Sequence, residues 1–96
     1  MAVRDLIARR RDEVLRAAAR HRARRIRLFG CAARGEERPD SDVDFLVDFE
    51  PNATLLDLGA LKDEIESLLG RQADVVTPAG ISPFLRQRIL REAAPL

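Results

Sequence analysis

The chain has 96 residues, 46% of them hydrophobic, and its 17 basic residues nearly cancel its 16 acidic residues. This length suits one small domain over residues 1–96, and the hydrophobic content excludes a disordered chain. A net charge of +1 gives no argument for direct nucleic-acid binding. One cysteine excludes an internal disulfide framework. No apolar run is long enough for a signal peptide or a membrane span, so we expect a cytoplasmic protein.

The N-terminal segment predicts an amphipathic helix over residues 3–21. Apolar side chains recur there at helical spacing, at Val3, Leu6, Ile7, Val14, Leu15 and Ala18. Arginines cover much of the remaining surface, which is typical of a solvated face, although some of them could meet an acidic partner or a substrate. The alternating residues 25–29 then predict a strand with Ile26 and Leu28 on one face.

A glycine turn and a second strand follow. Gly30 ends the first strand, and the small residues 31–35 favour one or two helical turns. Residues 36–41, which include a proline, predict a loop. Acidic and apolar side chains alternate over residues 42–48, and this pattern predicts a strand with one apolar face.

The middle of the second half predicts a helix and a third strand. Residues 54–69 repeat apolar side chains at helical spacing, ahead of Gly70, which occupies a favoured position for a C-terminal glycine. We expect this stripe in the core; its members are Leu55, Leu58, Leu61, Ile65 and Leu68. The β-branched residues in 73–77 predict the strand.

The end of the chain predicts a last helix. Ser82 followed by a proline is a favourable helix start, and we expect Leu85, Ile89 and Leu90 to face inward. The element order is therefore αβαβαβα, without a repeat, a low-complexity tract or a linker.

Two acids on the second strand give the first functional signal. Because side chains alternate across a strand, Asp42 and Asp44 are expected to leave the same face. Two carboxylates at such a short distance repel each other unless a cation lies between them. The turn at Gly30 would let backbone N–H groups approach an anion. Either signal alone is common, since alternating acids often mark a solvated strand face. Together they favour a divalent metal that holds a nucleoside triphosphate.

A third carboxylate is expected in a two-metal transfer site, beside the metal that activates the attacking hydroxyl. Asp74 is the best candidate, because its neighbours Ala73 and Val75 should face the core. The alternative is a solvent-facing acid at the start of a strand. Asp48 shares the face of the acid pair but lies farther along the strand, and we interpret it as a solvated strand-end acid.

These motifs resemble the signature of minimal nucleotidyltransferases (MNT), a group of the DNA polymerase β superfamily. That signature reads Gly-Ser-x-Ala-Arg-Gly, a short loop and Ser-Asp-x-Asp, and it is similar to residues 30–35 and 41–44. Residues 69–76 are similar to the strand with the family's third acid. The resemblance implies an α+β (α/β-like) nucleotidyltransferase fold, with a small mixed sheet of three or four strands backed by helices.

The resemblance also implies the site and its cofactors. Asp42 and Asp44 would bind two Mg²⁺ ions, and Asp74 would complete the catalytic metal site. The reaction would transfer a nucleoside monophosphate from a triphosphate, with ATP as the donor. The matching nucleotide-binding positions are Gly30, Cys31, Arg34 and Ser41.

One position departs from the family pattern, because Cys31 stands where the family usually has serine. A thiol is a weaker hydrogen-bond donor to phosphate than a hydroxyl is. The backbone N–H survives the change, so we expect weaker nucleotide affinity rather than a complete loss.

Stand-alone chains of this size and motif resemble antitoxins that are encoded beside HEPN-domain RNase toxins. This likeness implies transfer of AMP to a tyrosine hydroxyl of a HEPN-domain partner. Two alternatives stay open. One is an MNT-fold binding module, catalytically weak or inactive, that neutralises its partner by contact. The other is transfer to a small molecule such as an aminoglycoside, which would ordinarily require an extra substrate domain.

Overall fold

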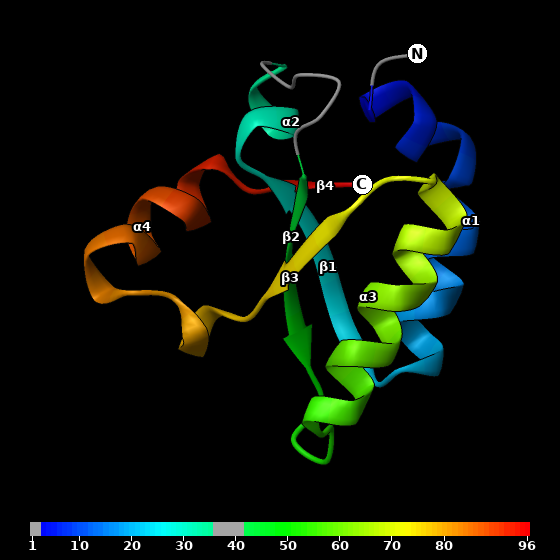
Figure 1. Ribbon diagram of the computed structural model, residues 1–96. Helices are drawn as coiled ribbons and strands as arrows, with labels where there is room; N and C mark the ends of the chain where they lie inside the picture. Colours follow the sequence, from blue (N-terminus) through cyan, green and yellow to red (C-terminus); the bar gives the residue numbers. More distant parts are fainter. Residues whose placement is uncertain (1–2, 36–41) are drawn as a thin grey trace.

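The computed structural model describes residues 3–35 and 42–96 (Figure 1). The predicted loop at 36–41, which includes Ser41, lies outside these residues. Each predicted helix and strand is present, with ends that differ from the expected ones by one or two residues. In chain order the elements are α1 (Val3–Arg20), β1 (Ala23–Phe29), α2 (Cys31–Arg34), β2 (Val43–Phe49), α3 (Leu55–Leu69), β3 (Ala73–Val76), η1 (Pro78–Gly80), α4 (Pro83–Glu92) and β4 (Ala94–Pro95).

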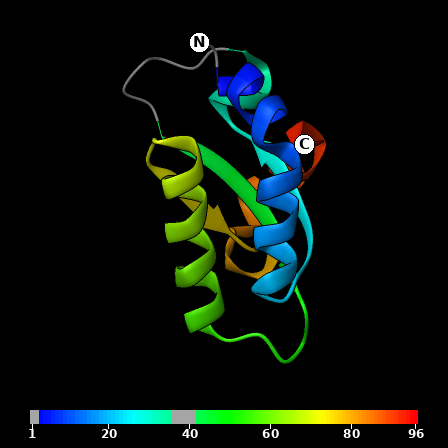
Figure 2. The same cartoon turned by 90° about the vertical axis from the view of Figure 1, so that its right-hand side faces the viewer.

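The strands form one mixed sheet in the order β3-β2-β1-β4. β1 pairs antiparallel with both β2 and β4, whereas β2 pairs parallel with β3. α1 and α3 lie side by side over one face of this sheet, and α4 lies on the opposite side (Figures 1 and 2). The arrangement confirms the expected α+β class with a small mixed sheet backed by helices.

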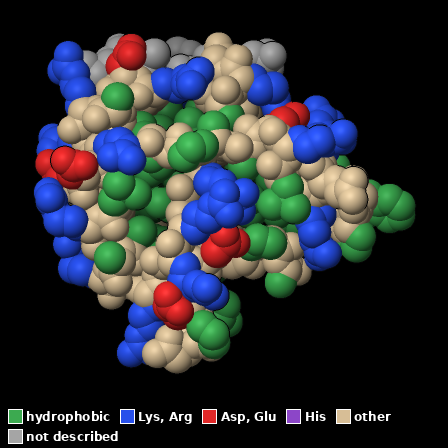
Figure 3. Space-filling view, turned by 180° about the vertical axis from the view of Figure 1, so that it is seen from behind, with side chains coloured by type: hydrophobic (Ala, Val, Ile, Leu, Met, Phe, Trp, Pro, Cys, Tyr) green, Lys and Arg blue, Asp and Glu red, His purple; other side chains and the backbone are tan. Residues whose placement is uncertain are grey.

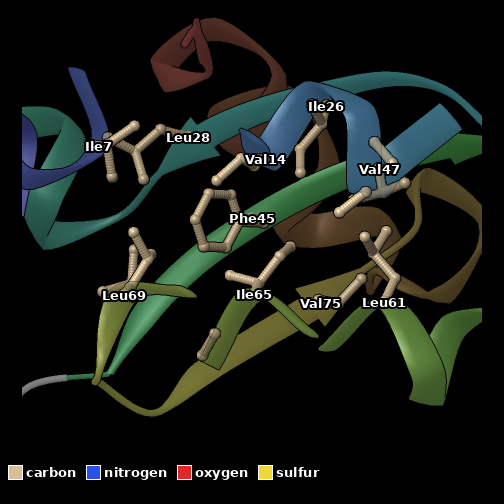
Figure 4. Close-up of a cluster of buried hydrophobic side chains, with 14 of the residues drawn as sticks. Ile7, Val14, Ile26, Leu28, Phe45, Val47, Leu61, Ile65, Leu69 and Val75 are labelled. Atoms are coloured by element: carbon tan, nitrogen blue, oxygen red, sulfur yellow. The ribbon is translucent and has the colours of Figure 1, made fainter. Parts of the chain in front are cut away.

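The core lies between the sheet and the pair of helices α1 and α3 (Figure 4). Phe45, in the middle of β2, is completely buried, and so are Leu61 and Ile65 on α3. α1 closes the other half of this layer with Ile7 and Val14. Burial of large apolar side chains is the main stabilising contribution here, at about 1.5–3 kcal/mol for each one fully buried.

The arginine-rich side of α1 faces outward, as expected of a solvated helix face. Lys and Arg side chains line the side of the molecule on which α1 lies (Figure 3). The end of α1 is tied to α3, because Arg20 pairs with Glu64 and His21 Nε2 lies 2.7 Å from Glu64 Oε2. None of the described helices has the length and apolarity needed to cross a bilayer.

Two predictions about apolar side chains are wrong. Leu55 is 84% exposed, and α4 leaves Leu85 and Leu90 exposed instead of turning them inward. Helical spacing identifies an apolar stripe but does not say what covers it. Leu55 lies in the first turn of α3, which extends beyond the sheet, and α4 lies on the side away from the core (Figure 1).

Two short elements carry no signal in the sequence. η1 occupies the segment expected to be a turn, and β4 adds an edge strand to β1 through the register Arg27↔Pro95 and Leu28↔Ala94. A two-residue strand that contains proline has neither alternation nor β-branched residues. Proline is nevertheless tolerated on a sheet edge, where one N–H can be spared.

Asp48, for which the sequence predicts a solvated acid, pairs with a buried arginine. The Arg27 side chain is almost completely buried, its Nη2 lies 3.4 Å from Asp48 Oδ2, and its Nε has no hydrogen-bond partner among the described residues. The acid therefore compensates a cation that has little access to water.

Asp48→Ala should destabilise the fold by about 2 kcal/mol, because removing one partner leaves a buried charge uncompensated. Chemical denaturation of the purified variant measures this change. Adding Arg27→Met, which keeps an apolar stem and removes the charge, should recover much of the loss. Equal stability of wild type and Asp48→Ala would contradict this pairing.

Candidate active site

The sheet register brings two of the predicted acids together. Asp44 lies directly beside Asp74 in the parallel β2–β3 ladder, and opposite Phe29 in the antiparallel β1–β2 ladder. Ala73 and Val75 are buried, so Asp74 is turned to the other face and is exposed. Alternation along each strand thus places both carboxylates on the face that α1 and α3 leave uncovered.

The charges of the other two carboxylates act on the carboxyl group of Asp44. Burial, followed by the charges of Asp74 and Asp42 and a hydrogen bond with Asp74, raises the pKa of the Asp44 carboxyl from 3.8 to about 6. Asp42 is exposed just before β2 begins, since the strand starts one residue later than expected, yet it is close enough to contribute. The three predicted acids therefore form one electrostatically coupled group.

Gly30 lies against the carboxylate of Asp44. Its φ of +74° is a left-handed conformation that other residues rarely adopt. A Cβ atom at this position would lie 2.5 Å from Asp44 Oδ2, which is well inside van der Waals contact. The turn between β1 and α2 therefore requires glycine for two independent reasons, its backbone conformation and its approach to the carboxylate.

The other predicted nucleotide-binding positions lie around this turn. Cys31 begins α2, but its side chain is not among the described parts of the structure, and Ser41 lies outside the described residues. Arg34, at the end of α2, is close enough to Asp44 to lower the pKa of that carboxyl in part, and its Nη1 donates to Glu92 Oε2 at 3.0 Å. A cation thus lies beside the acids.

A polar hollow of about 570 Å³ opens beside Asp42 and Asp74, and Lys62 and Arg71 also line it. Glu66 anchors its wall, because it accepts a hydrogen bond from the Ala73 backbone N–H at 2.8 Å. This bond, together with Lys62, keeps the pKa of Glu66 below its ordinary value. Sequence reasoning missed Glu66; the only signal was its helical spacing from Lys62, which does not reveal a bond to a strand.

A larger hollow, of about 710 Å³, lies near the other end of β2 and is lined by Arg24, Arg25, Asp48 and Thr77 among others. None of the three coupled carboxylates lines it. We therefore place the candidate site at the smaller hollow, where titratable groups perturb one another.

The residues present fit hard divalent cations. Their donors are carboxylate oxygens, which Mg²⁺ prefers, and a cation would offset the charges of Asp74 and Asp42, which add to burial in raising the pKa of Asp44. In the described residues no three His, Cys, Asp or Glu side chains are already arranged around one point. The assignment of individual ligands stays a prediction.

Comparison with known proteins supports a transferase. A family model described as a nucleotidyltransferase domain matches residues 11–96. A Methanocaldococcus jannaschii protein assigned as a protein adenylyltransferase is 46% identical over 74 residues, which are 77% of this chain and 80% of that protein. The protein adenylyltransferase MntA of Thermococcus cleftensis is 42% identical over 69 residues, covering 72% of this chain and 70% of the relative.

Solved structures share the fold. One, described as a minimal nucleotidyltransferase, superposes with a TM-score of 0.88 at 52% identity and covers 100% of this chain and 97% of its own. Another, a toxin–antitoxin structure with AMP-PNP, gives a TM-score of 0.73 at 20% identity, with 88% and 69% of the two chains covered. The second likeness is evidence for the fold alone.

Proposed function

This chain belongs to the nucleotidyltransferase domain family, in the minimal group of the DNA polymerase β superfamily, and on that premise we propose that it transfers AMP from ATP to a protein hydroxyl. The observation that carries the proposal is the coupled group of Asp42, Asp44 and Asp74 beside the Gly30 turn. The names of the relatives as protein adenylyltransferases support the donor and the acceptor class.

Each residue of the candidate site has a separate role in this proposal. Asp42 and Asp44 would hold two Mg²⁺ ions, and Asp74 would be a further ligand of one of them. The bound ions would neutralise charge on the triphosphate and align the reacting oxygens. Gly30 lets the Asp44 carboxylate lie against the turn between β1 and α2, and Arg34 supplies a positive charge that Glu92 holds in place.

The reaction replaces the phosphoanhydride bond between the α- and β-phosphates of ATP by a phosphoester bond to the acceptor. The acceptor oxygen forms a bond to the α-phosphorus, and the bond from that phosphorus to the bridging oxygen of the β-phosphate breaks. Pyrophosphate leaves with that electron pair. The acceptor's proton passes to the solvent, and we propose that Asp74, which is exposed at the polar hollow, accepts it first.

We further propose that the acceptor is a tyrosine of a HEPN-domain toxin, so that transfer makes this chain an antitoxin. The motif resemblance supports this step, and so does the relative named MntA. The neighbouring gene should then encode a small helical protein with an Arg-x-x-x-x-His motif.

Incubation with ATP labelled at the α-phosphate, MgCl₂ and the purified product of the neighbouring gene tests the proposal. Wild type should label that protein, and label at the γ-phosphate should not be transferred. Asp42→Asn and Asp44→Asn should abolish labelling, whereas Asp63→Asn, an exposed acid on α3, should not. Undiminished labelling by the two site variants would show that these acids do not carry the reaction.

One observation favours a second function. Cys31 replaces the serine usual in the family, as expected if the site has decayed into a module that acts by contact. Such a module should neutralise the toxin without labelling it, and Asp44→Asn should neutralise it as well as wild type does. Retention of all three acids favours the enzyme.

A further inference from the structure

α4 is attached to the rest of the chain by polar contacts rather than by a buried apolar face. None of its side chains is buried. Arg86 donates to the carbonyl oxygens of Pro78 and Ile81, and Glu92 accepts from Arg34. Phe84 is 95% exposed and Leu85 is 49% exposed. Of the large apolar side chains of this helix, Ile89 is half-buried, and Phe84, Leu85 and Leu90 remain exposed.

One side of α4 combines apolar and basic groups. Phe84, Leu85, Arg88 and Arg91 follow the spacing of a single helix face, and we call these four residues the α4 surface. The helix carries three arginines and one glutamate. Hydrophobic side chains project at the edge of the molecule where α4 lies, with Lys and Arg side chains beside them (Figure 3). Aromatic and arginine side chains are the types enriched at the centres of protein interfaces.

α4 lies on the Asp44 side of the sheet, although none of its residues lines the polar hollow. The helix lies on the side of the sheet opposite α1 and α3, as Figures 1 and 2 show, and this is the side to which Asp44 and Asp74 are turned. Its last turn is joined to α2 by the ion pair between Glu92 and Arg34. A protein seated on α4 would therefore be held on the same side of the sheet as the carboxylates.

We propose that the α4 surface docks the protein acceptor, through an apolar pocket on the acceptor that is bordered by acidic side chains. This inference rests on the proposed transfer to a protein hydroxyl. The positive charge of α4 favours an acidic acceptor over a second copy of the chain as the occupant of this surface. α4 carries three arginines, and its one glutamate, Glu92, already pairs with Arg34 and Arg88, so the α4 helix of a second copy would offer no unpaired acid to Arg91.

Acceptor kinetics test the docking surface. The double variant Phe84→Ala/Arg91→Glu should raise KM for the neighbouring gene's protein at least about 10-fold and leave kcat nearly unchanged, because the removed groups act in binding. Binding of ATP with Mg²⁺ and the thermal midpoint should match those of wild type, since both side chains are exposed. The wild-type KM should also rise with NaCl concentration as the charges are screened.

Leu56→Ala is the matched control, because Leu56 is also a highly exposed apolar side chain (84%), and it lies on α3. It should keep the wild-type KM. A double variant with the wild-type KM would overturn the docking assignment. A double variant that changes the sedimentation of the chain alone would overturn it in favour of self-association. Failure of wild type itself to label the protein would count against the proposed acceptor, and against docking on α4 with it.

Discussion

Asp44→Asn should abolish nucleotidyl transfer while making the folded protein more stable at neutral pH. Loss of a carboxylate that holds the reacting groups should lower kcat/KM by at least about 100- to 1,000-fold. The same carboxylate is ionised at a cost in the folded protein, because burial and then the charges of Asp74 and Asp42 raise its pKa to about 6. Function and stability therefore make opposite demands on this residue.

The pH dependence gives the sign of the stability effect. With a pKa of 3.8 in the unfolded chain and about 6 in the folded one, the folded state holds this proton more tightly. That stabilising contribution is complete below about pH 4 and is lost as the pH rises through about 6. The gain from Asp44→Asn should therefore be small near pH 4 and reach about 2 kcal/mol above pH 7, after a discount for the carboxyl's partial exposure.

Urea denaturation of both proteins at several pH values measures this difference. Asp63→Asn controls for the general effect of removing one negative charge, and its stability difference from wild type should stay within about 0.5 kcal/mol. A variant less stable than wild type above pH 7 would mean that Asp44 is not repelled by its neighbours.

Gly30→Ala should also inactivate the protein. Its Cβ would meet Asp44 Oδ2 at 2.5 Å, so the carboxylate or the turn has to shift, and the left-handed φ adds a cost of about 1–2 kcal/mol. We expect transfer activity to fall at least about 100-fold, because displacement of a reacting group by about 1 Å can have that effect.

Gly35→Ala separates the two causes. Gly35 has nearly the same φ, +73°, but a Cβ atom added there would have no atom of another segment within 4 Å. This variant should lose only the stability that the left-handed φ costs, as measured by thermal denaturation, and should keep most of the activity. Equal activities of the two variants would mean that contact with Asp44 is not the reason for glycine at position 30.

The sequence predicts those parts of the fold in which local pattern and tertiary packing agree. The apolar spacing of Val3, Ile7 and Val14 identifies the face of α1 that packs on the sheet. Gly70 ends α3 with a φ of +66°, as its position predicts. Leu85 follows the same helical rule but is exposed, because periodicity contains no information about which neighbour covers a stripe.

In the candidate site, too, the sequence predicts what local pattern determines and misses what depends on contacts between distant segments. Alternation predicts that Asp44 and Asp74 turn away from the core, and the strand register then makes them neighbours. The anchoring of β3 by Glu66 and the pairing of Arg27 with Asp48 depend on contacts between distant segments. Such contacts have no local pattern, so only the folded arrangement reveals them.

Calorimetric titration with the α,β-methylene analogue of ATP tests the central claim most directly, because the bond broken in transfer is blocked and no acceptor is needed. The claim is that the coupled carboxylates hold the nucleotide together with divalent cations. Wild type should bind the analogue in MgCl₂ and lose most of that affinity in EDTA, and Asp44→Asn should bind it weakly in both. Equal affinity of wild type in MgCl₂ and EDTA, or an Asp44→Asn variant that binds like wild type, would contradict the account.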